Sequence, residues 1–268
     1  MDHPSITNQE FTRFQSLIYK IAGIQMAESK KVLLVGRLTK RLKHYNLENF
    51  GDYYNLVTGK GQDAELQMMV DLLTTNETYF FREPKHFEYL DSEILTKVKP
   101  GSSFAIWSAA CSSGEEPYTL SMVLADRFGE GPWQITASDI STAVLARAKT
   151  GLYPMERTKG ISRPHLQKYC LKGTRTQEGS FMISKKLRER IRFLQVNLNA
   201  PLPDIGPFDV IFLRNVMIYF DMDTKRQVVA NLITKLKPGG YFIVGHSETL
   251  NGITDKLQAI KPTIYRKS

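Results

Sequence analysis

The sequence predicts a doubly wound α/β fold preceded by a helical segment, and three observations support this class. From about residue 75 onward, short apolar runs alternate with helical stretches, which is the βαβ pattern of a parallel sheet. One run, residues 104–107, enters a tight turn of small residues and then a helix. A second run, residues 134–137, ends in Ser138 and Asp139. We therefore expect a buried sheet with a ligand site where its strands end.

The elements of this sheet follow from composition and from turn residues. Besides the helix that begins at Glu115, we expect helices at residues 142–149 and 224–236, and we interpret residues 237–240 as the stop of the last one. Residues 209–213 are typical of a buried central strand. The predicted strands are residues 103–108, 133–138, 191–196, 208–213, 240–245 and 263–266.

The first part of the chain has a different pattern. From Phe11 to about Leu73 the apolar residues recur three and four apart, and no strand signal interrupts them. We therefore divide the chain into an all-helical domain, residues 1–74, and an α/β domain, residues 75–268. Four basic residues of the helical domain share one helix face and form a candidate docking stripe: Arg37, Lys40, Arg41 and His44. A merely solvated helix face is an equally good interpretation.

Residues 155–192 are too long for an ordinary loop of a doubly wound fold. Gly160, Gly173 and Gly179 separate short pieces such as residues 180–184, so we predict a small antiparallel β insertion. The segment holds eleven Lys/Arg against three Asp/Glu, and therefore supplies most of the net charge of +9. Such local charge suggests an acidic partner, although a solvated face explains it as well.

Composition limits the classes of protein that remain. The 268 residues and 42% hydrophobic content are those of a globular chain. We see no apolar run long enough to span a bilayer and no signal-peptide pattern, so we expect a cytoplasmic protein without membrane insertion. Cys111 and Cys170 have no metal or disulfide spacing, and the five histidines suggest no metal site.

The turn after the first strand indicates which ligand to expect. Gly114 is its one glycine, which argues against a dinucleotide fingerprint. Glu115 and Glu116 open the following helix, where a phosphate would be repelled. Asp139 follows Gly114 by 25 positions, near the spacing of a ribose-binding carboxylate. A cationic nucleoside fits this turn, and an ordinary turn without a ligand is the alternative.

The motifs, taken in order, resemble those of the CheR-type chemotaxis receptor methyltransferases. The resemblance covers nearly the whole chain, because a helical domain of matching size precedes the motifs. They are residues 74–82, 107–110 with 114–118, 137–140, 196–199, 214–220, and 236–240 with 245–248.

The resemblance implies a Rossmann-like class I methyltransferase domain that uses S-adenosylmethionine and releases S-adenosylhomocysteine. The methyl group would go to glutamate side chains on the cytoplasmic helices of chemoreceptors. Asp139 would hold the ribose hydroxyls. Four other residues would line the cofactor, namely Asn76, Thr78, Arg82 and Glu116. The adenine and methionine ends would be completed by Asn197, Leu198, Arg214 and Asn215.

Such a reaction needs no general base, because a glutamate with a pKa near about 4.3 is already ionised at pH 7. The protein must instead align the carboxylate oxygen with the methyl carbon and sulfur. Arg82 and Tyr219 are our candidates for this catalytic orientation, with Arg82 shared with the carboxylate of the cofactor. We interpret His246 as structural.

The resemblance further implies that the β insertion of some members captures a peptide tether at the receptor C-terminus as an added strand. Gly173, Arg175 and Gly179 are the candidate tether residues, although Arg175 stands where a second glycine is expected. We expect a monomer and no nucleic-acid partner. Two other functions stay open: a nucleic-acid methyltransferase of the same fold, and a cofactor-binding regulator that no longer transfers methyl groups.

Overall fold

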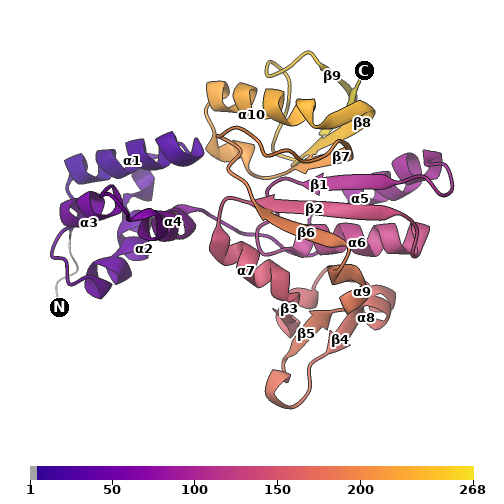
Figure 1. Cartoon of the computed structure of the whole chain (residues 1–268), viewed down its shortest axis with the longest axis horizontal. Coiled ribbons are helices and arrows are strands. Elements are labelled where there is room, and N and C mark those ends of the chain that lie inside the picture. The colour runs from indigo at the N-terminus through magenta and orange to yellow at the C-terminus, as the bar shows by residue number, and fades with distance from the viewer. Residues whose placement is uncertain (1–4) are drawn as a thin grey trace.

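The computed structural model describes residues 5–268 and begins with a bundle of four helices (Figure 1). These are α1 (Asn8–Ala22), α2 (Lys31–His44), α3 (Phe50–Val57) and α4 (Asp63–Leu73). Thr7 and Glu10 form a capping box at the start of α1, and Gly23 ends that helix with a φ of 69°. Phe14, Leu34 and Tyr53 are fully buried between the helices. The bundle therefore has a hydrophobic core of its own.

The second part of the chain is built on a seven-stranded sheet in the order β6-β2-β1-β7-β8-β10-β9. Strands β6, β2, β1, β7 and β8 are parallel, whereas β10 runs antiparallel to both β8 and β9. The strands are β1 (Phe104–Ser108), β2 (Trp133–Asp139), β6 (Ile191–Gln195), β7 (Phe208–Leu213), β8 (Leu236–Val244), β9 (Leu257–Lys261) and β10 (Ile264–Lys267). The strand order reverses at β1, which has β2 on one side and β7 on the other.

Both faces of this sheet are buried, as expected for a doubly wound fold. Ile106 and Phe212 point into the core that contains Leu120 of α6 (Glu115–Phe128). Their neighbours Trp107 and Leu213 point into the opposite core, which α10 (Met222–Thr234) covers. The predicted fold class is confirmed. The remaining helices beside the sheet are α5 (Lys85–Tyr89) and α7 (Thr142–Thr150).

Two details of the C-terminal region differ from the expectations. Residues 237–240 do not stop a helix, because α10 already ends at Thr234 and these residues belong to β8. A register shift between Phe208 and Val210 lets β7 pair with a strand that contains Pro238, which has no N–H to donate. Strand β9 was not predicted, since its side chains are mostly exposed.

The predicted small antiparallel sheet is found at the basic segment, with the order β3-β5-β4, although its first strand lies just before residue 155. Its strands are β3 (Leu152–Pro154), β4 (Cys170–Lys172) and β5 (Ser180–Ile183), and its helices are α8 (Arg163–Tyr169) and α9 (Lys185–Arg188). Figure 1 shows this insertion projecting from the main sheet, well away from the helical bundle. Within residues 5–268 no helix combines the length and apolar character needed to cross a bilayer.

Candidate functional site

A cavity of about 350 Å³ lies at the carboxyl ends of the parallel strands. This is where doubly wound folds bind ligands, beside the point at which the strand order reverses. The cavity is lined by all ten residues that the sequence singled out for cofactor binding or catalysis: Asn76, Thr78, Arg82, Glu116, Asp139, Asn197, Leu198, Arg214, Asn215 and Tyr219. They come from segments far apart in the chain that the fold brings together.

The backbone geometry of the turn between β1 and α6 requires a glycine. Gly114 has a φ of 98°, and a Cβ at this position would lie 2.9 Å from both Ala148 Cβ and Tyr153 Oη. A larger residue would therefore collide with its neighbours as well as strain the backbone. Ser112 in the same turn also has a left-handed backbone, with a φ of 48°. Its N–H donates to Asp139 Oδ2 at 2.9 Å, which fixes the turn against the end of β2.

Asp139 is a buried carboxylate at the edge of the cavity. Its Oδ1 accepts a hydrogen bond from the Ser141 N–H at 3.0 Å, so each carboxylate oxygen is held by a backbone amide. Burial raises the pKa of Asp139, and these amides only partly offset that effect. Each carboxylate oxygen has a second lone pair that a ligand hydroxyl can use. The position suits a bond to the ribose of a nucleoside.

Arg214 lies between two carboxylates at the wall of the cavity. Its Nη1 donates to Glu116 Oε2 at 2.8 Å, and its Nη2 donates to Glu83 Oε2 at 2.9 Å. Burial would raise the pKa of Glu83, but the charge of Arg214 and hydrogen bonds from Asn215 and Arg214 lower it to about 2. The other oxygen of Glu116 accepts from Ser108 Oγ at 2.7 Å. Glu83, which the sequence does not single out, therefore helps to hold Arg214 in place at this wall.

These contacts change the electrostatic interpretation of the site. The sequence suggested that Glu116 would attract a cation directly, but in the structure its charge is paired with Arg214. Glu83 pairs with the same guanidinium, so two carboxylates share one positive charge. The group retains an excess of negative charge beside Asp139. A positively charged ligand remains better suited to the cavity than a diphosphate.

The two candidate catalytic residues are less constrained than Arg214. Arg82 is half-buried, and its guanidinium donates to the Glu77 carbonyl at 2.9 Å and lies 5.9 Å from the centre of the Tyr79 ring. No ion pair is found for Arg82 among the described residues. Tyr219 lies in the short turn Met217–Tyr219 and is also half-buried. Both line the cavity.

Glu248 holds the loop that carries Arg214, Asn215 and Tyr219. Its carboxylate accepts hydrogen bonds from the backbone N–H groups of Asn215, Val216 and Met217 at 2.8 to 2.9 Å, and from Gly245 at 2.7 Å. Asn215 itself has a left-handed backbone with a φ of 57°. Four backbone donors on one buried carboxylate fix the shape of this loop. The sequence analysis placed Glu248 within a motif but gave it no role.

The helical bundle also forms part of the cavity wall, which the sequence did not reveal. Ile24 pairs with Phe220 in an isolated bridge, and the Gln25 N–H donates to the Tyr219 carbonyl at 2.8 Å. Asn197 Nδ2 donates to the Ile21 carbonyl at 2.7 Å, so this amide joins the two parts of the chain. The wall residues from the bundle include Met26, Lys30 and Leu33.

The predicted docking stripe divides into two pairs of residues. Arg37 donates to the carbonyls of Leu73 and Thr74 at 3.0 Å, and Arg41 binds Glu65 through two bonds of 2.8 and 2.6 Å. Both arginines are thus engaged within the protein, which corrects the expectation that all four side chains are available. Lys40 and His44 are exposed.

The insertion contacts the cavity through one arginine. Arg157 Nη1 donates to the Thr78 carbonyl at 2.6 Å and lies 3.6 Å from Glu115 Oε1. Among the candidate tether residues, Arg175 and Gly179 have left-handed backbones with φ of 55° and 81°. A Cβ on Gly173 would lie 2.0 Å from the Gln177 carbonyl. Arg175 stands where the resemblance favours a glycine, and its left-handed backbone is one that suits glycine.

Two known protein families match this chain. Residues 76–266 match the CheR methyltransferase, SAM binding domain family, and residues 9–74 match the CheR methyltransferase, all-alpha domain family.

Named relatives are similar over nearly the full length. The chemotaxis protein methyltransferase of Escherichia coli (strain K12) is 38% identical over 98% of this chain and 92% of that protein. The protein of the same name from Klebsiella aerogenes is 39% identical over 97% and 90%. Among solved structures, the glycopeptide N-methyltransferase MtfA complexed with S-adenosyl-L-methionine has a TM-score of 0.38 and 18% identity, over 72% of this chain and 69% of that one. That likeness is too distant to indicate function.

Proposed function

The chain belongs to the CheR methyltransferase family, and we propose that it transfers the methyl group of S-adenosylmethionine to glutamate side chains of chemoreceptors. The product would be a glutamate methyl ester, which changes the charge of the receptor during sensory adaptation. The observation that carries this proposal is the cavity at the strand ends, with Asp139, Glu116 and Arg214 on its wall and Glu83 paired with Arg214 beside it.

The donor set of the cavity fits S-adenosylmethionine. Asp139 would accept bonds from the ribose hydroxyls, and the carboxylates on the wall would favour the positive sulfonium. Leu198 is an apolar side chain on the wall, buried and suited to contact the adenine. Asn197 uses its side chain within the protein, so we assign it a positioning role rather than a direct contact. The bound cofactor supplies an activated methyl group.

The protein itself would orient the incoming carboxylate. Arg82 has carbonyl and aromatic neighbours but no carboxylate partner among residues 5–268, so its charge is available to an anion. Tyr219 would donate one neutral hydrogen bond near the methyl group. Arg214 cannot take this part, because Glu83 and Glu116 already occupy its guanidinium. An oriented carboxylate that needs no deprotonation reacts without a general base.

We further propose two contacts with the receptor. Lys40 and His44 would approach the acidic methylation helices, because they remain exposed on α2. The insertion would accept a peptide tether along an edge of its three-stranded sheet, since β3 and β4 both have one unpaired side. The exposed residues Arg175 and Gly179 lie in the loop between β4 and β5. The protein would act as a monomer in the cytoplasm.

A labelling experiment tests the proposed reaction. The protein is given S-adenosylmethionine with a labelled methyl group, together with receptor-bearing membranes or with RNA. We expect label on the receptor that is released by mild base, as an ester would be. The matched control is a receptor whose methylated glutamates are changed to glutamine, which should remain unlabelled. Label on RNA alone, or on the glutamine receptor to the same extent, would overturn the proposal.

A further inference from the structure

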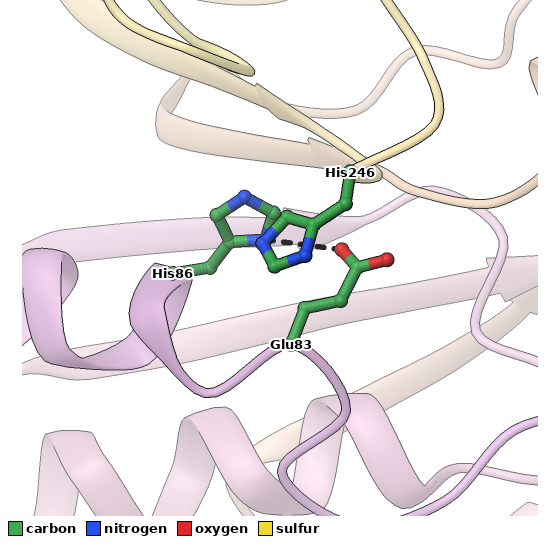
Figure 2. Close-up of side chains that lie close together, drawn as sticks. All are labelled: Glu83, His86 and His246. Atoms are coloured by element: carbon green, nitrogen blue, oxygen red, sulfur yellow. Dashed lines mark ion pairs between the residues drawn. The ribbon is translucent and has the colours of Figure 1, made fainter.

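Glu83, His86 and His246 meet beside the cavity although they are distant in the sequence. Glu83 precedes α5, His86 lies within α5, and His246 follows β8 (Figure 2). One ligand atom from each residue lies within 4.8 Å of the other two. The sequence analysis predicted no metal site, because no spacing between these residues suggests a ligand set. The fold alone brings them together.

The hydrogen bonds of His86 leave one ring nitrogen without a partner. His86 is 2% exposed, and its Nε2 lies 2.8 Å from Thr263 Oγ1. Thr263 Oγ1 also lies 2.6 Å from the Pro262 carbonyl, which can only accept its one hydroxyl proton. In the arrangement that satisfies both contacts, His86 Nε2 is the donor and Nδ1 carries a lone pair. Nδ1 is buried and has no hydrogen-bond partner.

This lone pair faces another acceptor. His86 Nδ1 lies 3.4 Å from Glu83 Oε2. Glu83 is ion-paired with Arg214 and accepts a hydrogen bond from Asn215, so its carboxylate has no proton to offer. Two acceptors held this close without a proton between them repel each other. A cation between them removes that repulsion.

The spacing between His86 and Glu83 is that of two neighbouring ligands in a tetrahedral metal site. Zinc bonds to imidazole nitrogen and carboxylate oxygen are about 2.0–2.1 Å long, so neighbouring ligand atoms of a tetrahedron lie about 3.3–3.4 Å apart. The 3.4 Å between His86 Nδ1 and Glu83 Oε2 agrees with this value. His246 is exposed, and one of its ring nitrogens lies within 4.8 Å of the other two ligand atoms, so its side chain would move inward to complete a third bond.

We propose that Glu83, His86 and His246 bind one transition-metal ion of the Zn²⁺ class, with the fourth position open to water. Two imidazole nitrogens and one carboxylate oxygen are a donor set that Zn²⁺ accepts. The second bond of His86, from Nε2 to Thr263, would fix the ring as outer contacts do in metal sites. Arg214 shares Glu83 Oε2, so the ion and this guanidinium would compete for the same charge.

Metal binding to the full-length protein tests the proposal directly. Zn²⁺ is titrated in a calorimeter, and Co²⁺ is followed by its visible absorption, which reports tetrahedral ligands. We expect one equivalent to bind the natural protein. His246→Ala should weaken metal binding by more than about tenfold, because substitutions of residues that only contact the ligands already weaken it by about that much. His44→Ala removes an equally exposed histidine on α2 and should leave the affinity unchanged.

Equal affinities for the natural protein and His246→Ala would overturn the proposal, and so would the absence of stoichiometric binding. His246 is on the surface, so the variant should keep the fold, which circular dichroism can check. The measurement requires neither cofactor nor receptor. Its failure would therefore leave the proposed methyl transfer untouched.

Discussion

The cavity and the basic face of α2 use charged residues in opposite ways. At the cavity, Arg214 is buried, and two carboxylates fix its guanidinium. On α2, Arg37 and Arg41 also bind within the protein, but Lys40 and His44 next to them are exposed. The buried charge at the cavity is thus bound within the protein, whereas only part of the charge on the α2 face is. The number of basic residues on a face consequently overstates what a partner can bind.

The largest effect should follow from Arg214→Met. It leaves Glu83 and Glu116 without their shared counter-charge, and breaking a buried pair costs about 3–5 kcal/mol. Urea unfolding monitored by fluorescence measures the loss. Arg82→Met is the matched control, because Arg82 has no carboxylate partner and should change stability by less than about 1 kcal/mol while still reducing methyl transfer. Equal destabilisation by the two variants would show that the cavity charges are not structural.

Asp139→Asn should weaken binding of S-adenosylmethionine by about 10- to 100-fold. The change removes charge-assisted bonds to the ribose, which contribute about 1.5–3 kcal/mol. Calorimetric titration of the cofactor measures the effect. Asp126→Asn is the control, since Asp126 contacts His165, Lys168 and Tyr169 outside the cavity. Undiminished affinity in Asp139→Asn would exclude Asp139 from the cofactor site.

Glu65→Gln tests the buried charge of the helical bundle through pH. Burial would raise the pKa of Glu65, but hydrogen bonds from Arg41, Tyr53 and Tyr45 lower it below 4.5 overall. The ionised Glu65 carboxylate therefore stabilises the fold at pH values above 4.5. This stabilisation is lost as the pH falls through the lowered pKa. We expect the variant to lose about 1–2 kcal/mol at pH 7. The difference from the natural protein should vanish in acid; a constant difference down to pH 2 would contradict the assignment.

The smallest effect should come from the exposed part of the α2 face. Lys40→Glu combined with His44→Glu should raise the KM for receptor a few-fold at low salt, because exposed charge pairs contribute at most about 1 kcal/mol each. The increase should disappear at high ionic strength. Lys60→Glu, an exposed lysine between α3 and α4, is the control. If both variants behave alike, the α2 face does not dock the receptor.

The position of the cavity could be predicted from the sequence because strands leave a characteristic pattern. Asp139 and Arg214 each follow an apolar run, and the carboxyl ends of parallel strands meet at one edge. Glu83 could not be predicted, since it lies in a segment with no strand signal and reaches Arg214 only through the fold. Periodicity placed Arg37 and Arg41 on a helix face, but it could not show that backbone carbonyls and Glu65 bind them.

The insertion and the last strands show the same limit. Glycines predict an antiparallel sheet in residues 155–192; β4 and β5 lie there, and β3 immediately precedes the segment. The left-handed backbone of Arg175 left no trace in the sequence, because arginine has no preference for it. Residues 237–240 were misinterpreted because Pro-Gly-Gly is typical of helix ends, whereas here the bulge opposite Phe208 and Val210 accommodates it in β8.

The contact between the helical bundle and the loop at Tyr219 would make a cofactor bound in the cavity a crosslink between the two parts of the chain. The Gln25 N–H binds the Tyr219 carbonyl, and Asn197 binds the Ile21 carbonyl. A ligand that touches both walls binds only the docked arrangement, and at a hundredfold excess over its Kd it would stabilise that arrangement by about 2.7 kcal/mol. Proteases should then cleave the junction near residues 74–76 more slowly when the cavity is filled.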